Sequence, residues 1–111
     1  MNYNIPRDYT ETPGARWRHQ GPYSGEEFRE ERLEPLYQKV RGTNEIITIT
    51  LDGAYGYPPS FLEEAFGGLV RQYPNDDVYS KFSFVSNDQP DLIEKIHQYI
   101  IHANDDSGKR G

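Results

Sequence analysis

The chain has 111 residues, no cysteine and a formal net charge of -6. This length fits one domain with one modest hydrophobic core. The lack of cysteine excludes disulfides and thiolate metal sites, no apolar run could span a bilayer, and the first residues lack the pattern of a secretion signal. We therefore expect a soluble cytoplasmic domain with no membrane segment.

The negative charge falls in the second part of the chain. Residues 1–44 hold seven Lys or Arg and seven Asp or Glu, which cancel, whereas residues 45–111 hold five and eleven, which gives -6. Phosphate contacts need clustered Lys and Arg, so this balance argues against a nucleic-acid partner. An acidic surface suits a basic protein partner, but it is more commonly a means of keeping a protein soluble.

Residues 1–23 contain two short segments with strand character. These are Tyr3–Ile5 and Ala15–Arg18, and the Pro13-Gly14 pair between them is typical of a turn. The run from Arg16 to His19 mixes cations with Trp17, a combination that can bind bases, but a patch this short is more often a solvated edge strand. We expect two edge strands here and no nucleic-acid site.

A first helix is predicted after Ser24. Ser24 and Glu27 have the spacing of a capping box, in which each side chain accepts a hydrogen bond from the other residue's backbone N–H. The apolar residues that follow at helical spacing are Phe28, Leu33, Leu36, Tyr37 and Val40. Pro35 lies inside this span and lacks an N–H, so we expect a kink or a break near residues 31–34.

The second part of the chain alternates strands with helices. Ile46–Leu51 is β-branched and mostly apolar, which predicts a central strand covered on both faces, and Lys81–Val85 alternates as the next strand. A last helix is expected after Pro90, and residues 105–111 are expected to form a disordered polar tail beyond a domain of residues 1–104. This order predicts an α/β sheet with helices packed on it.

A second capping box is predicted at Ser60, three residues before Glu63. The apolar residues behind it fall at the spacing of one helical stripe, and they are Leu62, Ala65, Phe66, Leu69 and Val70. Ser60 is therefore expected to open this helix, with its hydroxyl displayed between a strand and a helix. A helix N-terminus favours negative charge, so Ser60 is a candidate phosphoacceptor, although most serines at such positions only cap.

The loop before this helix is aromatic and apolar. Loops at the carboxyl ends of strands are where α/β sheets place their sites, and exposed aromatic side chains favour protein contacts, although buried lids have a similar composition. We interpret the loop and the start of the helix as a partner-binding surface, with these contact residues: Tyr55, Tyr57, Pro58, Pro59, Phe61 and Glu64.

Four blocks of the sequence carry a family resemblance. They are Tyr9-Thr10-Glu11-Thr12-Pro13-Gly14-Ala15-Arg16, Gly21-Pro22-Tyr23-Ser24-Gly25-Glu26-Glu27-Phe28-Arg29, Leu33-Glu34-Pro35-Leu36, and the stretch from Ser60 to Arg71. In this order they resemble the small prokaryotic STAS-like family of unknown function, over about Tyr9 to Ala103. STAS domains are the fold of anti-sigma factor antagonists and of the cytoplasmic ends of sulfate transporters.

This resemblance implies a fold, a partner and a switch. The implied fold is a small mixed four-stranded sheet with about three helices. Anti-sigma factor antagonists engage an ATPase or kinase of the histidine-kinase type when unphosphorylated, and their regulatory phosphoserine starts the helix after the central strand, where this chain has Ser60. Those proteins usually carry Asp-Ser-Ser-Gly, whereas this chain has Pro58-Pro59-Ser60-Phe61, so the acidic neighbour and the glycine are missing.

Catalytic, metal and cofactor sites find little support in the sequence. His97 and His102 are five residues apart, which does not place them on one helical face, and His19 has no local carboxylate partner. The pair Gly67-Gly68 lies within a helical period and belongs to no phosphate-binding loop, so close helix packing is its expected reason. We expect no catalytic residue, no metal and no cofactor.

The leading hypothesis is a non-enzymatic STAS-like regulatory module that binds a histidine-kinase-type ATPase and is switched at Ser60. The alternative is an accessory or scaffolding subunit of a prophage or defence cassette in which Ser60 is never modified. An enzyme ranks third. The sequence does not predict the oligomeric state.

Overall fold

The computed structural model describes the backbone of residues 1–110 and the side chains of residues 1–105. The strands are β1 (Asn2–Asn4), β2 (Ile47–Thr50) and β3 (Phe82–Val85). The α-helices are α1 (Ile5–Asp8), α2 (Gly25–Phe28), α3 (Glu34–Val40), α4 (Pro59–Leu62), α5 (Gly68–Gln72) and α6 (Asp91–Arg110). Two π-helical stretches, η2 (Arg29–Leu33) and η3 (Glu63–Gly67), and two 3₁₀ turns, η1 (Arg18–Gln20) and η4 (Tyr79–Lys81), complete the order.

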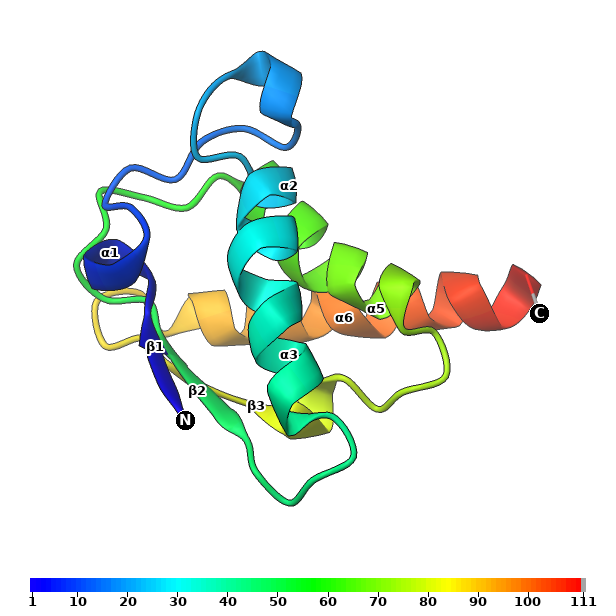
Figure 1. Ribbon diagram of the computed structural model, residues 1–111. Helices are drawn as coiled ribbons and strands as arrows, with labels where there is room; N and C mark the ends of the chain where they lie inside the picture. Colours follow the sequence, from blue (N-terminus) through cyan, green and yellow to red (C-terminus); the bar gives the residue numbers. More distant parts are fainter. Residues whose placement is uncertain (111) are drawn as a thin grey trace.

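The sheet has three strands in the order β1-β2-β3, and both pairings are parallel. The predicted central strand is confirmed, because β2 lies between the other two (Figure 1). The predicted mixed four-stranded sheet is wrong for residues 1–110. Each strand is followed by a helical segment that returns the chain to the same end of the sheet, and this connection makes neighbouring strands parallel.

The missing strand is Ala15–Arg18, which pairs with a helix start instead of the sheet. The carbonyls of Ala15 and Arg16 accept from the N–H groups of Gly25 and Glu26, at 2.9 and 3.0 Å. Residues 11–23 form an arm that projects beyond α2, at the top of Figure 1, and its base is closed by the bond from Gly14 N–H to Tyr23 O, 2.8 Å. The carbonyls of Ala15 and Arg16 therefore find their hydrogen bonds at the start of α2 and not in the sheet.

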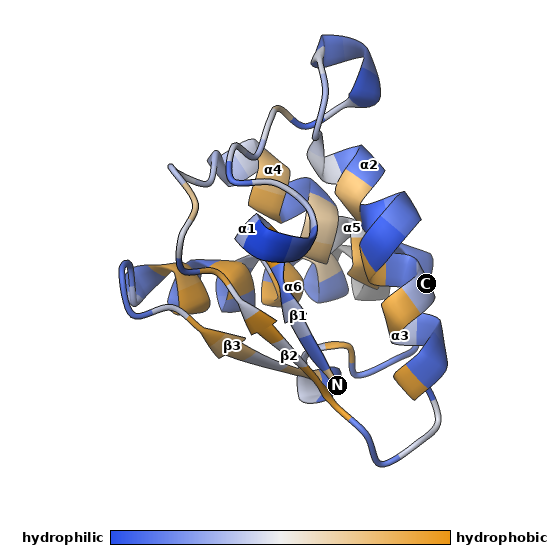
Figure 2. Cartoon of the chain, turned by 60° about the vertical axis from the view of Figure 1, so that its left-hand side comes forward, coloured by the Kyte–Doolittle hydropathy of each residue, from blue (hydrophilic) through white to orange (hydrophobic). Residues whose placement is uncertain are grey.

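Only one face of the sheet is covered by helices (Figure 2). Ile47 and Ile49 on that face are buried, whereas Thr48 and Thr50 on the other face are half-buried. The expectation that β2 is covered on both faces is therefore wrong. The alternation of Ile and Thr along β2 is the pattern of a strand with one solvated face.

Pro35 does not break its helix. Glu34 N–H bonds the carbonyl of Arg29, five residues back, so the chain passes from α2 through the π-helical η2 into α3 with helical backbone angles throughout. Pro35 directly follows this wider turn, and its ring is accommodated there without a break in the helical backbone. The expected break is replaced by a wider helical turn.

The core lies between the sheet and the helices. Its members are buried at 7% exposure or less, and they are Ile5, Phe28, Leu33, Tyr37, Val40, Ile47, Ile49, Leu51, Phe61, Leu62, Ala65, Phe66, Leu69, Val70, Val78, Phe82, Leu92, Ile96, Ile100 and Ala103. The predicted helix after Pro90 is confirmed as α6. Of the predicted tail, residues 105–111, the side chains of 106–111 and all of Gly111 lie outside the described residues, and the tail stays a prediction.

Candidate functional site

The loop between β2 and α4, residues 51–58, leaves the sheet at the carboxyl ends of its parallel strands. Asp52 ties this loop to the one after β3. Its Oδ1 accepts from the backbone N–H groups of Asn87 and Asp88 at 2.7 and 2.8 Å, and its Oδ2 accepts from Asn87 Nδ2 at 3.0 Å. The N–H bonds from Asp88 and Asn87 hold the pKa of Asp52 below its usual range. The two loops are thus fixed to each other by one carboxylate.

Tyr55 is the most exposed large hydrophobic side chain of the described residues, at 85%. Its backbone is nonetheless fixed, because Tyr55 N–H donates to the carbonyl of Glu11 at 2.9 Å. Two residues on, Tyr57 is half-buried and its hydroxyl donates to the carbonyl of Leu51 at 2.7 Å. Burial raises the pKa of Tyr57, so its hydroxyl stays protonated as a donor. The loop is rigid at both sides of an exposed aromatic ring.

Ser60 does not cap its helix, so the predicted capping box is wrong. The helix begins at Pro59 with Pro58 as its cap, and the N–H groups of Phe61 and Leu62 bond the carbonyl of Pro58. Two prolines preset this start, because a proline in the first turn has the helical φ and no N–H to satisfy. Ser60 therefore falls in the first turn, half-buried, and its hydroxyl makes no hydrogen bond within residues 1–105.

Phe61 and Glu64 are buried, at 0% and 4% exposure, and cannot face a partner in this structure. Phe61 stacks on Phe28 of α2 with ring centroids 5.6 Å apart. The remaining residues of the predicted surface are reachable: Tyr55 and Pro59 are exposed, and Tyr57, Pro58 and Ser60 are half-buried. The candidate surface therefore shrinks to the loop and the first turn of α4.

Behind this surface lies a network of three arginines and three glutamates that joins the arm, η2 and η3. Arg16 Nη1 contacts Glu63 Oε1 at 2.5 Å and Glu64 Oε1 at 3.5 Å. Arg71 reaches Glu63 at 2.8 Å, Arg29 reaches Glu64 at 3.1 Å, and Arg29 also pairs with Glu34. Burial opposes ionisation of Glu63, but hydrogen bonds from Arg71 and Arg16 hold its pKa below the usual range.

Gly67 and Gly68 make room for this network, as close packing predicted. A Cβ on Gly68 would lie 2.7 Å from Nε of Arg29, and one on Gly67 would lie 2.4 Å from a carboxylate oxygen of Glu63. The Nε of Arg29 is buried against Gly68 and has no hydrogen-bond partner in the described residues. Both π-helical stretches meet at this network, and such turns are frequent at functional sites.

The sequence reasoning missed the network. Its members, Arg16, Arg29, Glu34, Glu63, Glu64 and Arg71, all lie inside the blocks that carry the family resemblance. Glu63 and Glu64 stand at helical spacing from Arg71, but Arg16 and Arg29 come from other segments, and no spacing rule brings them to this helix. The one usable signal was the costly pair Gly67-Gly68, which indicates a close approach without naming what approaches.

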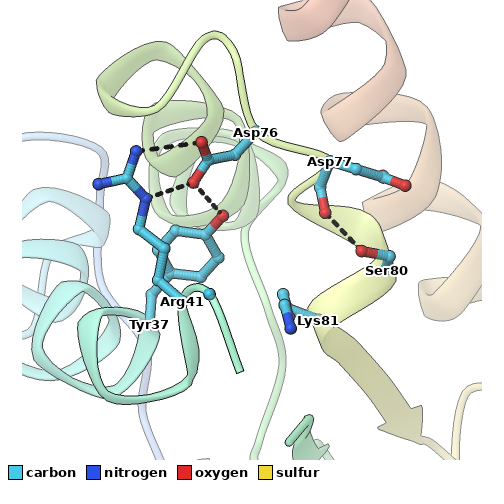
Figure 3. Close-up of a pocket in the computed structure, with 7 residues that line it drawn as sticks. Tyr37, Arg41, Asp76, Asp77, Ser80 and Lys81 are labelled. Carbon is cyan, nitrogen blue, oxygen red and sulfur yellow. Dashed lines mark hydrogen bonds and ion pairs between the residues drawn. The ribbon is translucent and has the colours of Figure 1, made fainter. Parts of the chain in front are cut away.

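A pocket of about 340 Å³ lies at the other end of the sheet (Figure 3). The Tyr37 hydroxyl donates a hydrogen bond to Asp76 Oδ2 at 2.7 Å, and the Arg41 guanidinium binds both carboxylate oxygens of Asp76 at 2.7 and 3.1 Å. Lys81 donates to the carbonyl of Thr43. The remaining lining residues are Gly42, Asp77 and Ser80. The carboxylate of Asp76 satisfies Arg41 and Tyr37, so these contacts fasten α3 to the loop before η4.

Other candidate features have structural partners or find no support in the described part of the chain. Arg18, from the cationic run, pairs with Glu30 and Glu31 at 3.1 and 2.8 Å. Within the described residues, no His, Asp and Glu side chains gather in a group of three that could hold a metal ion. None of the described helices combines the length and apolar character needed to cross a membrane.

Comparison with known proteins identifies the family of the chain. The family model for the STAS-like domain of unknown function (DUF4325) matches residues 24–92, a shorter range than the resemblance noted from Tyr9 to Ala103. No curated protein and no solved structure matches the chain. The matched range contains β2, β3, η2, η3 and five of the six members of the ion-pair network. The chain belongs to the family of STAS-like domains of unknown function.

Proposed function

We propose that this chain is a non-enzymatic regulatory module that binds a protein partner through the loop of residues 52–58 and the first turn of α4. The observation that carries this proposal is Tyr55, which is 85% exposed on a loop whose backbone is fixed. An aromatic side chain in a preformed position loses little conformational entropy on binding, which is why such residues dominate interface energies.

Two further features support this surface. It lies at the carboxyl ends of parallel strands, where α/β sheets place their binding sites. It is also preorganised by contacts from two other segments, through Glu11 of the arm and Asn87 after β3, and by the bond from Tyr57 to Leu51 within the loop itself. A loop with its backbone held by hydrogen bonds and an exposed aromatic side chain fits a macromolecular partner, because Tyr55 is 85% exposed and projects from the surface.

The partner class comes from the family resemblance. It implies an ATPase of the histidine-kinase type that docks when the first turn of α4 is unmodified. Such an enzyme would also supply the phosphoryl group for Ser60, which stands half-buried beside the exposed Pro59. A phosphate there would place about two negative charges among Tyr57, Pro58 and Pro59, where desolvation of the charge opposes docking. Ser60 is thus the proposed switch of a cytoplasmic regulatory module.

The proposal is tested by replacing Tyr55 with Ala and measuring affinity for a purified histidine-kinase-type ATPase by isothermal titration calorimetry. Removing a central aromatic contact should weaken binding at least tenfold, since interface hot spots cost about 2 kcal/mol or more on truncation. Ile46→Ala is the matched control, because Ile46 is 43% exposed before β2, at the opposite end of the sheet. Equal affinities for the wild-type chain and Tyr55→Ala would remove the loop from the interface.

A further inference from the structure

The helix that starts at Pro59 carries Ser60, Glu63 and Glu64 on one face. Residues three and four apart are neighbours on a helix surface, so the hydroxyl of Ser60 stands one turn before both carboxylates. Those carboxylates bind Arg16, which comes from the arm. A group attached to Ser60 would therefore enter the neighbourhood of the Arg16 guanidinium.

Arg16 has hydrogen-bonding capacity to spare. Both of its ion pairs use Nη1, and within the described residues its Nη2 and Nε have no hydrogen-bond partner. Its side chain is 29% exposed, so these donors are not sealed in the core. Its backbone is anchored, because the carbonyl of Arg16 accepts from Glu26 N–H at 3.0 Å. The Arg16 guanidinium thus lies beside the helix that starts at Pro59, with its Nη2 and Nε donors unused. Two such donors on a planar guanidinium can bind a phosphate.

Arg16 is also the cation that the network can release most readily. If Arg16 moves, Glu63 keeps Arg71 at 2.8 Å and Glu64 keeps Arg29 at 3.1 Å. Arg29, by contrast, is buried at 7% exposure and joins Glu64 to Glu34, so its departure would leave a buried carboxylate without its close partner. A new anion on Ser60 would therefore draw Arg16 and leave both carboxylates paired.

We propose that Arg16 binds a phosphate on Ser60, so that the conformation of the arm depends on whether Ser60 is phosphorylated. This inference rests on the phosphorylation in the proposed function. In that step the Oγ of Ser60 bonds the γ-phosphorus of ATP, the bond from that phosphorus to the bridging oxygen breaks, ADP leaves, and the hydroxyl proton passes to a base of the kinase. The phosphate then takes the free donors of Arg16.

Phosphorylation of Ser60 would therefore change the structure around Arg16 in the arm as well as the surface of the loop. Trp17, 39% exposed, follows Arg16 directly, and the Arg16 guanidinium lies 5.8 Å from its ring centroid. A shift of Arg16 from Glu63 toward Ser60 alters the surroundings of this ring. The fluorescence of Trp17, the one tryptophan of the chain, therefore reports on the same event.

The experiment uses the full chain with phosphoserine incorporated at position 60 and follows the ³¹P resonance against pH, with no partner present. The second pKa of a free phosphoserine is about 6. Contact with a guanidinium favours the dianion, so this pKa should be lower by about 0.5 or more in the wild-type chain than in Arg16→Gln. Arg41→Gln is the control: it removes one positive charge at the pocket end of the sheet, where Arg41 binds Asp76 at 2.7 Å, and it should leave the phosphate pKa unchanged.

Arg16→Lys guards against misfolding of the Gln variant, because it keeps the charge and should give an intermediate pKa. Equal phosphate pKa values in the wild-type chain and Arg16→Gln, with both folded by circular dichroism, would overturn the inference. An equal shift in Arg16→Gln and Arg41→Gln would overturn it too, since it would report overall charge only. Neither result depends on the partner, so a failure here is distinct from a failure of Tyr55→Ala to weaken docking.

Discussion

Glu64 is a carboxylate enclosed by the protein and held by charge. It is 4% exposed, its Oε2 accepts from Arg29 at 3.1 Å, and a Cβ on Gly68 would lie 3.2 Å from that same oxygen. A buried ion pair adds little stability compared with apolar packing, but removing one member leaves the other charge stranded. The network therefore fixes the arm and two helices in one arrangement. Loss of either a positive or a negative side chain from the network should destabilise that arrangement.

We predict that Glu64→Gln lowers the free energy of unfolding by about 3 kcal/mol, because Arg29 loses its buried counter-charge. Urea denaturation followed by circular dichroism measures this directly. The matched control is Glu30→Gln, since Glu30 pairs with Arg18 at 3.1 Å but is 46% exposed, and such pairs contribute within about 0.5 kcal/mol. Similar midpoints for the two variants would show that burial does not distinguish these carboxylates.

For individual residues, the sequence predicted contacts between residues that are close together along the chain. Ser24 caps α2 as expected, with its Oγ accepting from Glu27 N–H at 3.0 Å, because the cap and its partner are three residues apart. The return half of that capping box is absent: the Glu27 carboxylate accepts from the Tyr9 hydroxyl instead. Ser60 has the same motif, but Pro58 and Pro59 start the helix first. The burial of Phe61 and Glu64 depends on α2 and η2, which the local sequence does not reveal.

Among the elements, the loops after β2 and β3 behave as one unit. Their link is the carboxylate of Asp52, which binds two backbone N–H groups and one side-chain amide of Asn87 and Asp88. In the opposite direction, Gly53 N–H donates a hydrogen bond to Asp88 Oδ2 at 3.2 Å. Gly53 has a φ of +103°, which residues other than glycine rarely adopt. The position of Tyr55 therefore depends on a contact some 35 residues away in sequence.

We predict that Asp52→Asn destabilises the chain at pH 7 and that its difference from the wild-type chain closes in acid. Hydrogen bonds from Asp88 and Asn87 keep the pKa of Asp52 below its usual range in the folded state. The ionised form thus stabilises the fold above the unfolded pKa of about 3.9, and this contribution is lost as the pH falls through the lowered folded pKa. Urea midpoints between pH 7 and pH 3 measure the effect.

Asp77→Asn serves as the reference for that series, because the exposed Asp77 carboxylate makes no hydrogen bond or ion pair within the described residues. Its midpoint should follow the wild-type chain at each pH. A gap between Asp52→Asn and the wild-type chain that stays constant down to pH 3 would mean that the charge of Asp52 is irrelevant to the link between the loops.

Helices and strands were predictable where the apolar residues follow a single helical or strand spacing. The apolar stripes after Ser24, Ser60 and Pro90 are helical and the Ile46–Leu51 run is a strand, as expected. The π-helical turns were not predictable, because η2 and η3 form where Arg29, Glu63 and Glu64 meet across two helices, and the helical period is unchanged around them. Ala15–Arg18 was wrongly expected to be a strand since its backbone partners, Gly25 and Glu26, start a helix.

The whole molecule has two different ends. The carboxyl ends of the strands carry the loop of Tyr55, the first turn of α4 and, through Arg16, the arm. The amino ends carry the pocket in which Asp76 holds Arg41 and Tyr37. The core and the order of the strands follow from the sequence pattern, but the number of strands does not, because it depends on whether one polar segment finds its hydrogen bonds in the sheet or elsewhere.

Docking of a partner at the Tyr55 end of the molecule can be tested by hydrogen exchange. Amide exchange of the full chain is compared, residue by residue, with and without the purified histidine-kinase-type ATPase. We expect slower exchange at Gly53–Tyr57 and Ser60 in the complex, and unchanged exchange at residues 41–46 and 75–81 around the pocket. Slower exchange confined to the pocket end, with the Tyr55 loop unaffected, would contradict it.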